Sequence, residues 1–272
     1  MPGTRRLILL VSGLLSFVVL AAAPCLAVGP YLDAARMSAF IRAPHDPAVI
    51  GMITHSEADD HGASYYWLGG DFPVRTKFLL QLEVPYIDLA FDDELRDGFG
   101  DARLRAKARA WTWSGGAVYL LGGILFGSGS ADLFPYSTQS TDWEIGAAVV
   151  DTLGVRDERG HPQPLSSVSL WASVSAVYVT RLSDRIKTND LHGNYASLGF
   201  GAIYPLSLRF EVEAGGLMLG FRNGGTRMIF YGQLAFHYST STQLFATLQA
   251  EAGRREDRAS DYSAAIGMGI GL

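Results

Sequence analysis

Cysteine and charge are both scarce in this sequence. Cys25 is the only cysteine among the 272 residues, so the chain can form no internal disulfide, although disulfides are common in proteins exported to oxidising compartments. Only 18% of the residues are charged and the formal net charge is −5, so nothing in the charge balance indicates nucleic-acid binding. Stability must therefore come from backbone hydrogen bonds and packing.

Long hydrophobic runs are missing except at the N-terminus. There the run 7–23 follows Arg5 and Arg6 and precedes the small residues Cys25 and Ala27. A basic start, an apolar core and a small-residue exit are the parts of a secretory signal, so we expect cleavage after Ala27. An uncleaved membrane anchor is the alternative, but no basic stop-transfer cluster follows the run.

The rest of the chain must hide much apolar surface without helical spans. The sequence is 48% hydrophobic and contains 31 glycines, yet no later run approaches the roughly 18 apolar residues of a transmembrane helix. A closed β-barrel meets this requirement, because every backbone N–H and C=O pairs with a neighbouring strand and no sheet edge meets lipid.

Apolar and polar residues alternate in several segments, of which 206–214 is the clearest. One set of positions holds Leu206, Leu208, Phe210, Val212 and Ala214, and the other holds Ser207, Arg209, Glu211 and Glu213. A period of two places successive side chains on opposite faces of a β-strand. A helix would mix the two sets within two turns.

Segments of this kind number about twelve, and most reach the ~9–11 residues of a tilted transmembrane strand. We expect strands at 48–57, 63–72, 75–91, 98–113, 116–128, 141–153, 166–182, 193–204, 207–222, 225–239, 242–255 and 261–272. The predicted fold is all-β, a transmembrane antiparallel up-and-down β-barrel over 48–272. A signal peptide (1–27) and a short periplasmic stretch (28–47) would precede it.

The connections support this prediction, since outer-membrane barrels alternate short periplasmic turns with longer outer loops. Expected inner turns are 73–75, 114–115, the neighbourhood of Pro205, and 239–241; expected outer loops are 92–97, 129–140 and 183–192. Two connections misfit, because 154–165 is long for an inner turn and 223–224 is short for an outer loop. The final residue is Leu272, where such barrels usually end in Phe, so the assembly machinery would read a weaker signal.

Alternation alone does not say which face meets water. A secreted soluble β-sandwich or small barrel, with its apolar faces inward, is the alternative. The alternating loop lengths, the lack of disulfides and the final strand running to the last residue favour lipid outside.

The region 78–154 resembles a known outer-membrane family. It contains Leu-Glu-Val-Pro-Tyr at 82–86, Gly-Phe-Gly-Asp followed by a basic strand at 98–107, and Asp-Trp-Glu-Ile-Gly at 142–146. These features are similar to the "LPY … GxGD … K" core of the family named for the meta-pathway of phenol degradation, which is grouped with transporter-like barrels for hydrophobic compounds. Val84 departs from that core, and the Pro-Thr-Gly that often follows the fifth strand is missing. The resemblance implies an outer-membrane barrel of a Gram-negative envelope.

If the apolar faces meet lipid, the charged residues of the strands line the interior. The predicted lumen-lining residues are Glu83, Arg103, Arg105, Lys107, Arg109, Arg209, Glu211, Glu213 and Glu251. They would form a charged constriction that selects small solutes by field and width. The alternative is that they pair with one another and keep a narrow barrel shut.

Catalysis has little support in the sequence. Of the six histidines only His237 lies two residues before a serine, Ser239, which is the spacing seen in outer-membrane lipases. A histidine whose hydrogen bonds are satisfied inside the barrel is the commoner interpretation of such a position than a catalytic one. The glycine-rich segments open no helix that could hold phosphate. The group His55, Glu57, Asp59, Asp60 and His61 could bind a metal, but exposed charged loops are usually only solvated. We therefore expect no enzyme, no cofactor and no metal.

The function predicted from these patterns is passive passage of small compounds, hydrophobic or aromatic, across the outer membrane. The expected partners are outer-membrane lipids, the barrel-assembly machinery and a small-molecule solute. A closed structural or interaction barrel is the alternative, and a lipid-modifying enzyme is the third possibility.

Overall fold

The computed structural model describes residues 47–57, 61–75, 77–91, 94–130, 133, 141–156, 162–179, 195–221, 226–252 and 262–272. The predicted signal peptide (1–27) and nearly all of the predicted periplasmic stretch (28–47) lie outside these residues. Within them, no helix is long and apolar enough to cross a membrane.

The described residues form thirteen strands. They are β1 (Ala48–Glu57), β2 (His61–Arg75), β3 (Phe78–Phe91), β4 (Glu94–Phe99), β5 (Ala102–Trp113), β6 (Gly116–Phe126), β7 (Asp142–Arg156), β8 (Pro162–Val179), β9 (Tyr195–Pro205), β10 (Phe210–Phe221), β11 (Thr226–His237), β12 (Thr242–Ala252) and β13 (Tyr262–Gly271). Each predicted strand thus corresponds to an observed one, apart from the segment 98–113, which is divided between β4 and β5.

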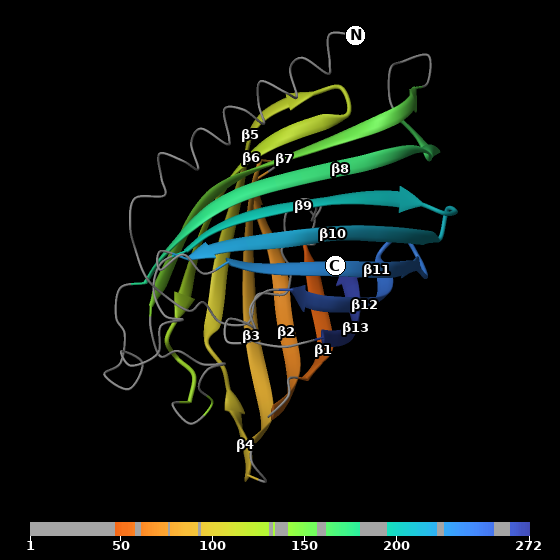
Figure 1. Ribbon diagram of the computed structural model, residues 1–272. Coiled ribbons are helices and arrows are strands. Elements are labelled where there is room, and N and C mark those ends of the chain that lie inside the picture. Colours follow the sequence, from red (N-terminus) through yellow and green to blue (C-terminus); the bar gives the residue numbers. More distant parts are fainter. Residues whose placement is uncertain are drawn as a thin grey trace.

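All neighbouring strands pair antiparallel, and the ring closes between the first and last of them (Figure 1). β13 pairs with β1 from Ala48 opposite Gly271 to Glu57 opposite Tyr262. We call the end that carries Pro47, Leu272 and the turns 114–115, 206–209 and 238–241 the terminal end, and the opposite end the loop end. The predicted barrel is confirmed: it is a closed antiparallel ring of twelve strands with one extra strand.

The extra strand results from a break in the fourth strand of the ring. β4 and β5 both pair with β3, one after the other along its length. The backbone N–H of Gly100 at the break donates to the Pro85 carbonyl at 2.9 Å, and a Cβ at Gly100 would lie 2.7 Å from Ile87 Cδ1. The prediction of an outer loop at 92–97 was wrong, because β3 and β4 form a hairpin there that extends past the ring, at the bottom of Figure 1.

The long inner connection predicted at 154–165 is also wrong. β7 continues to Arg156 and β8 already begins at Pro162, so both ends of this segment belong to strands, with Arg156 opposite Pro162. A bulge between Gly154 and Arg156 accommodates the extension, and Gly154 has φ +146, where a side chain would be strained. The turn expected at 73–75 is shifted similarly, because those residues end β2.

The side chains are arranged inside out relative to a soluble protein. Large apolar side chains cover the outer surface, including Leu68, Leu120, Ile145, Leu248 and Ile266, which are all more than half exposed. Polar and charged side chains point inward and are buried, including Gln81, Arg105, Lys107, Glu213 and Gln249. A soluble β-sandwich would place these sets the other way round, so the outer face is the lipid-facing one.

The interior is filled unevenly. A large apolar cluster occupies the side of the lumen formed by β6–β11, with Leu79 of β3; its buried members are Leu79, Leu121, Ala148, Trp171, Val177, Tyr195, Ile203, Leu217, Leu219, Ile229 and Tyr231. A smaller cluster packs Leu133 against Ala63, Tyr65, Ile87 and Leu89 of β2 and β3. Space is therefore left mainly between β1, β2, β3 and β11–β13.

Candidate functional site: a cavity inside the barrel

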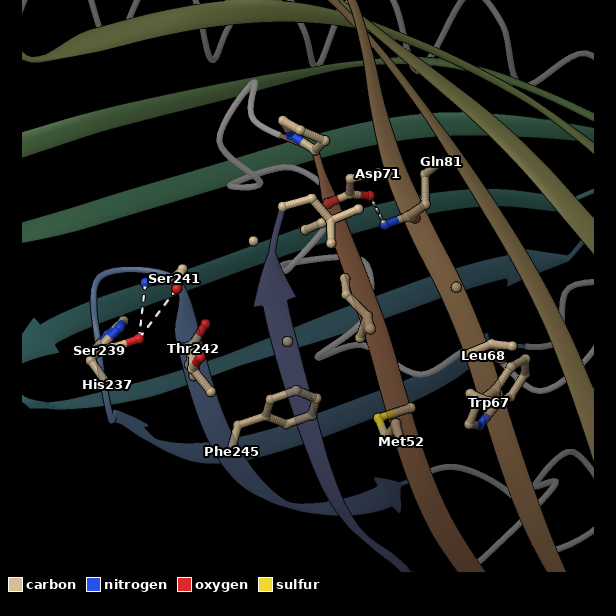
Figure 2. Close-up of a pocket in the computed structure, with 18 of the residues that line it drawn as sticks. Met52, Trp67, Leu68, Asp71, Gln81, His237, Ser239, Ser241, Thr242 and Phe245 are labelled. Carbon is tan, nitrogen blue, oxygen red and sulfur yellow. Dashed lines mark hydrogen bonds between the residues drawn. The ribbon is translucent and has the colours of Figure 1, made fainter.

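A cavity of about 770 Å³ opens inside the ring at its terminal end (Figure 2). Its lining comes from β1, β2, β3, β10–β13, the 238–241 turn and the residues Pro47 and Leu272. We call it the terminal-end cavity. Its volume lies within the ~300–1,000 Å³ typical of small-molecule sites.

Glycines on β13 leave room for this cavity. Gly267, Gly269 and Gly271 occupy alternate positions along one face, and Gly269 and Gly271 line the cavity. A Cβ added at Gly269 would find nothing within 4 Å, so the backbone of β13 forms this wall without a side chain. On β8, across the lumen, Trp171 fills the interior instead.

One part of the cavity wall is apolar and aromatic. Met52, Trp67 and Phe245 lie together at the bottom of Figure 2. Trp67 stacks on Tyr65 with ring centroids 5.7 Å apart and an interplanar angle of 10°. Through this stack the wall continues into the smaller apolar cluster around Leu133, which therefore bounds the cavity toward the loop end.

The other part of the wall is acidic. Gln81 Nε2 donates to Asp71 Oδ1 at 2.9 Å, and both residues are buried (Figure 2). Glu83 and Glu211 complete a set of three carboxylates, and no Lys or Arg is among the lining residues that the structure describes. Lys107 interacts electrostatically with Asp71 but lies over the Tyr119 ring, 5.0 Å from its centroid, and does not line the cavity.

The nine predicted lumen-lining residues fall into separate groups. Glu83 and Glu211 line the terminal-end cavity, whereas Arg103 and Arg105 border a much smaller hollow of about 20 Å³ with Asp142, Glu144 and Tyr195. In that hollow Arg105 Nε lies 3.4 Å from Glu144 Oε2. Arg109 is half-buried on the same strand as Lys107.

The remaining predicted residues take part in other contacts. Glu213 accepts hydrogen bonds from Trp171 Nε1 at 2.9 Å and from the Tyr231 hydroxyl, and Glu251 is paired with Arg227. Arg209 is exposed in the 206–209 turn, since β10 begins only at Phe210. The structure thus does not bring the nine residues together in a single constriction.

Sequence reasoning missed part of the site. Trp67 and Asp71 did not enter the predicted set of lumen-lining residues, which was chosen for charge on the most regular strands.

The metal site considered around His55 is not supported by the described residues. His55 Nδ1 lies 3.1 Å from Ser64 Oγ, while Asp59 and Asp60 lie outside the described part of the chain. The described residues contain no group of three or more His, Cys, Asp or Glu side chains placed to hold a metal ion.

Comparison with solved structures identifies the fold. An outer membrane channel from Pseudomonas putida F1 superposes with a TM-score of 0.65 at 11% identity, covering 84% of this chain and 95% of that one. The NanC porin gives 0.58 at 10% identity, over 83% and 100% of the two chains. The KdgM porin, solved with disordered oligogalacturonate, gives 0.55 at 8% identity, over 83% and 99%. This chain has the fold of outer-membrane β-barrels.

The sequence comparisons do not assign the chain to a protein family. No protein-family model matches the chain. A search of curated proteins finds no match either. The resemblance to the phenol meta-pathway family therefore remains a prediction.

Proposed function

We propose that the protein is an outer-membrane channel or transporter-like barrel through which small hydrophobic or aromatic compounds pass passively. The observation that carries this proposal is the terminal-end cavity, which lies inside a closed transmembrane ring and combines an aromatic wall with polar groups. In this proposal the signal peptide (1–27) directs export, the assembly machinery inserts the barrel, and the terminal end faces the periplasm.

Two further observations support the proposal. The apolar outer surface suits outer-membrane lipids, and the solved barrels of the same fold include a channel and two porins. The resemblance of 78–154 to the meta-pathway family supports a hydrophobic solute. A twelve-stranded ring lies between filled eight-stranded and open sixteen-stranded barrels, so its width permits a solute path without requiring one.

A closed structural or interaction barrel is the second candidate, and the filled side of the lumen favours it. The large apolar cluster and the packing of Leu133 together occupy much of the interior. In such a barrel the terminal-end cavity would open at the terminal end only and would not lead through the barrel. A lipid-modifying enzyme is a third candidate, and lipase assays on the purified protein would address it.

Solute flux with a blocking variant tests the proposal. Gly269→Trp places an indole in the open space beside β13, whereas Gly220→Trp adds the same group on the lipid-facing side of β10, where a Cβ also meets nothing within 4 Å. We expect the unaltered barrel to admit benzyl alcohol into proteoliposomes faster than protein-free vesicles do. Gly269→Trp should remove most of this excess and Gly220→Trp should keep it.

A different pair of results would contradict the channel proposal. Uptake no faster than in protein-free vesicles, together with no ion current in planar bilayers, would leave the closed barrel as the function.

A further inference from the structure

We infer that the terminal-end cavity selects organic cations, namely an ammonium group carried by an aromatic or other apolar body. This inference deepens the proposed function and rests on it for the passage of the ligand. The binding preference itself depends only on the cavity.

The first argument is the charge of the lining. Asp71, Glu83 and Glu211 contribute carboxylates to the wall, and the described lining contains no Lys or Arg. Lys107 of β5 acts on Asp71 but is fully buried and does not line the cavity. A cation in the cavity therefore has carboxylates, and no basic Lys or Arg side chain, among the described residues that line it, and the low-dielectric surroundings strengthen that attraction.

The second argument is hydrogen bonding by Gln81. Its Nε2 is used by Asp71, and its Oε1 accepts no hydrogen bond, although only 3% of the residue is exposed. A buried acceptor without a donor is unfavourable, so a ligand that donates N–H gains free energy there. An ammonium supplies three donors, an alcohol one and a carboxylate none.

The third argument is the aromatic part of the cavity wall. Trp67 and Phe245 present rings to the cavity, and Met52 adds a polarisable thioether. Aromatic faces attract cations as well as apolar groups. The same wall therefore suits the body of the ligand and does not oppose its charge.

These arguments specify both halves of the ligand. The acids and Gln81 select the head group, and the aromatic wall selects the body. A metal cation alone would use the carboxylates but would gain little from Trp67 and Phe245.

The test is a series of ligands with one phenyl body and three head groups. Isothermal titration of the full detergent-solubilised barrel with 2-phenylethylammonium, 2-phenylethanol and 3-phenylpropionate compares cation, neutral donor and anion directly. We expect the ammonium to bind about tenfold more tightly than the alcohol, which is the effect of one charge-assisted hydrogen bond, and the carboxylate to bind most weakly.

Two variants locate the effect. Glu211→Gln and Gln81→Met should each weaken ammonium binding by roughly tenfold and change alcohol binding by less. Asp97→Asn is the matched control, because Asp97 lies in the β3–β4 hairpin bonded to the Tyr86 hydroxyl and does not line the cavity. Its ammonium affinity should equal that of the unaltered protein.

The outcomes separate the two proposals. Equal or tighter binding of the alcohol or the carboxylate would overturn the inference, even if benzyl alcohol flux shows a working channel. Tight ammonium binding that Glu211→Gln weakens supports the inference, even if the barrel conducts nothing. Binding that neither variant changes places the ligand elsewhere and overturns it.

Discussion

Arg227 and Glu251 form a two-point ion pair across β11 and β12, with Arg227 Nη2 2.8 Å from Glu251 Oε2 and the Arg227 Nε on the other carboxylate oxygen. Both side chains are buried inside the ring. The pair holds the two strands together beyond their backbone ladder.

Glu251→Gln should destabilise the barrel, because it leaves a buried guanidinium without its counter-charge. Removal of one partner of a buried pair typically costs about 3–5 kcal/mol. The measurement is the urea midpoint of unfolding from lipid vesicles. The double variant Arg227→Met with Glu251→Leu removes both charges and should recover most of the loss; a double variant as unstable as the single one contradicts this account.

Leu248→Arg tests which face meets lipid. Leu248 lies in the middle of β12 with its side chain outward and 70% exposed. Arginine at the bilayer midplane costs about 2–4 kcal/mol and near the interface about 0–1 kcal/mol. We therefore expect a large loss of unfolding free energy for Leu248→Arg and a small one for Leu206→Arg, in the terminal-end turn. Similar losses at both positions would argue against a lipid-embedded outer face.

Leu133→Ser should raise ion conductance. Leu133 is completely buried against inward side chains of β2 and β3, in the cluster that bounds the cavity toward the loop end. An apolar constriction excludes water, so a hydroxyl there favours hydration of the path. Single-channel recording in planar bilayers measures this, with Leu95→Ser on the exposed β3–β4 hairpin as the control. Unchanged conductance would mean that this cluster is not the barrier.

Gly115→Ala should weaken the β5–β6 hairpin. Gly115 has φ 97 in the turn between Trp113 and Gly116, a region that only glycine enters readily. We expect a loss of about 1 kcal/mol in the unfolding free energy. Ser114→Ala in the same turn needs no such backbone angle and should lose less.

The sequence predicted the barrel well because the two faces of each strand meet opposite surroundings. Alternation in 210–214 and 243–252 reflects lipid on one side and a polar interior on the other, so it reports strands and their orientation directly. In 206–209 the same alternation belongs to an exposed turn. The break at Gly100 escaped notice, since alternation continues on both sides of it. The extension of β7 to Arg156 was hidden because a bulge shifts the register there.

The site was less predictable, because a cavity depends on what several strands do together. Charge identified Glu83 and Glu211, but Arg105 and Glu251 are equally charged and are paired elsewhere. What places the open space is the absence of side chains at Gly269 and Gly271, combined with bulk at Trp171 on the other side. The alternation within one strand does not show how the side chains of different strands divide the space inside the barrel.

The position of the cavity has a consequence for assembly. Its glycine wall belongs to β13, the last strand, which closes the ring by joining β1, the first. A nascent barrel with that junction still open would have no enclosed chamber at all. Closure of the ring and formation of the binding space are thus one event, because the same strand completes both.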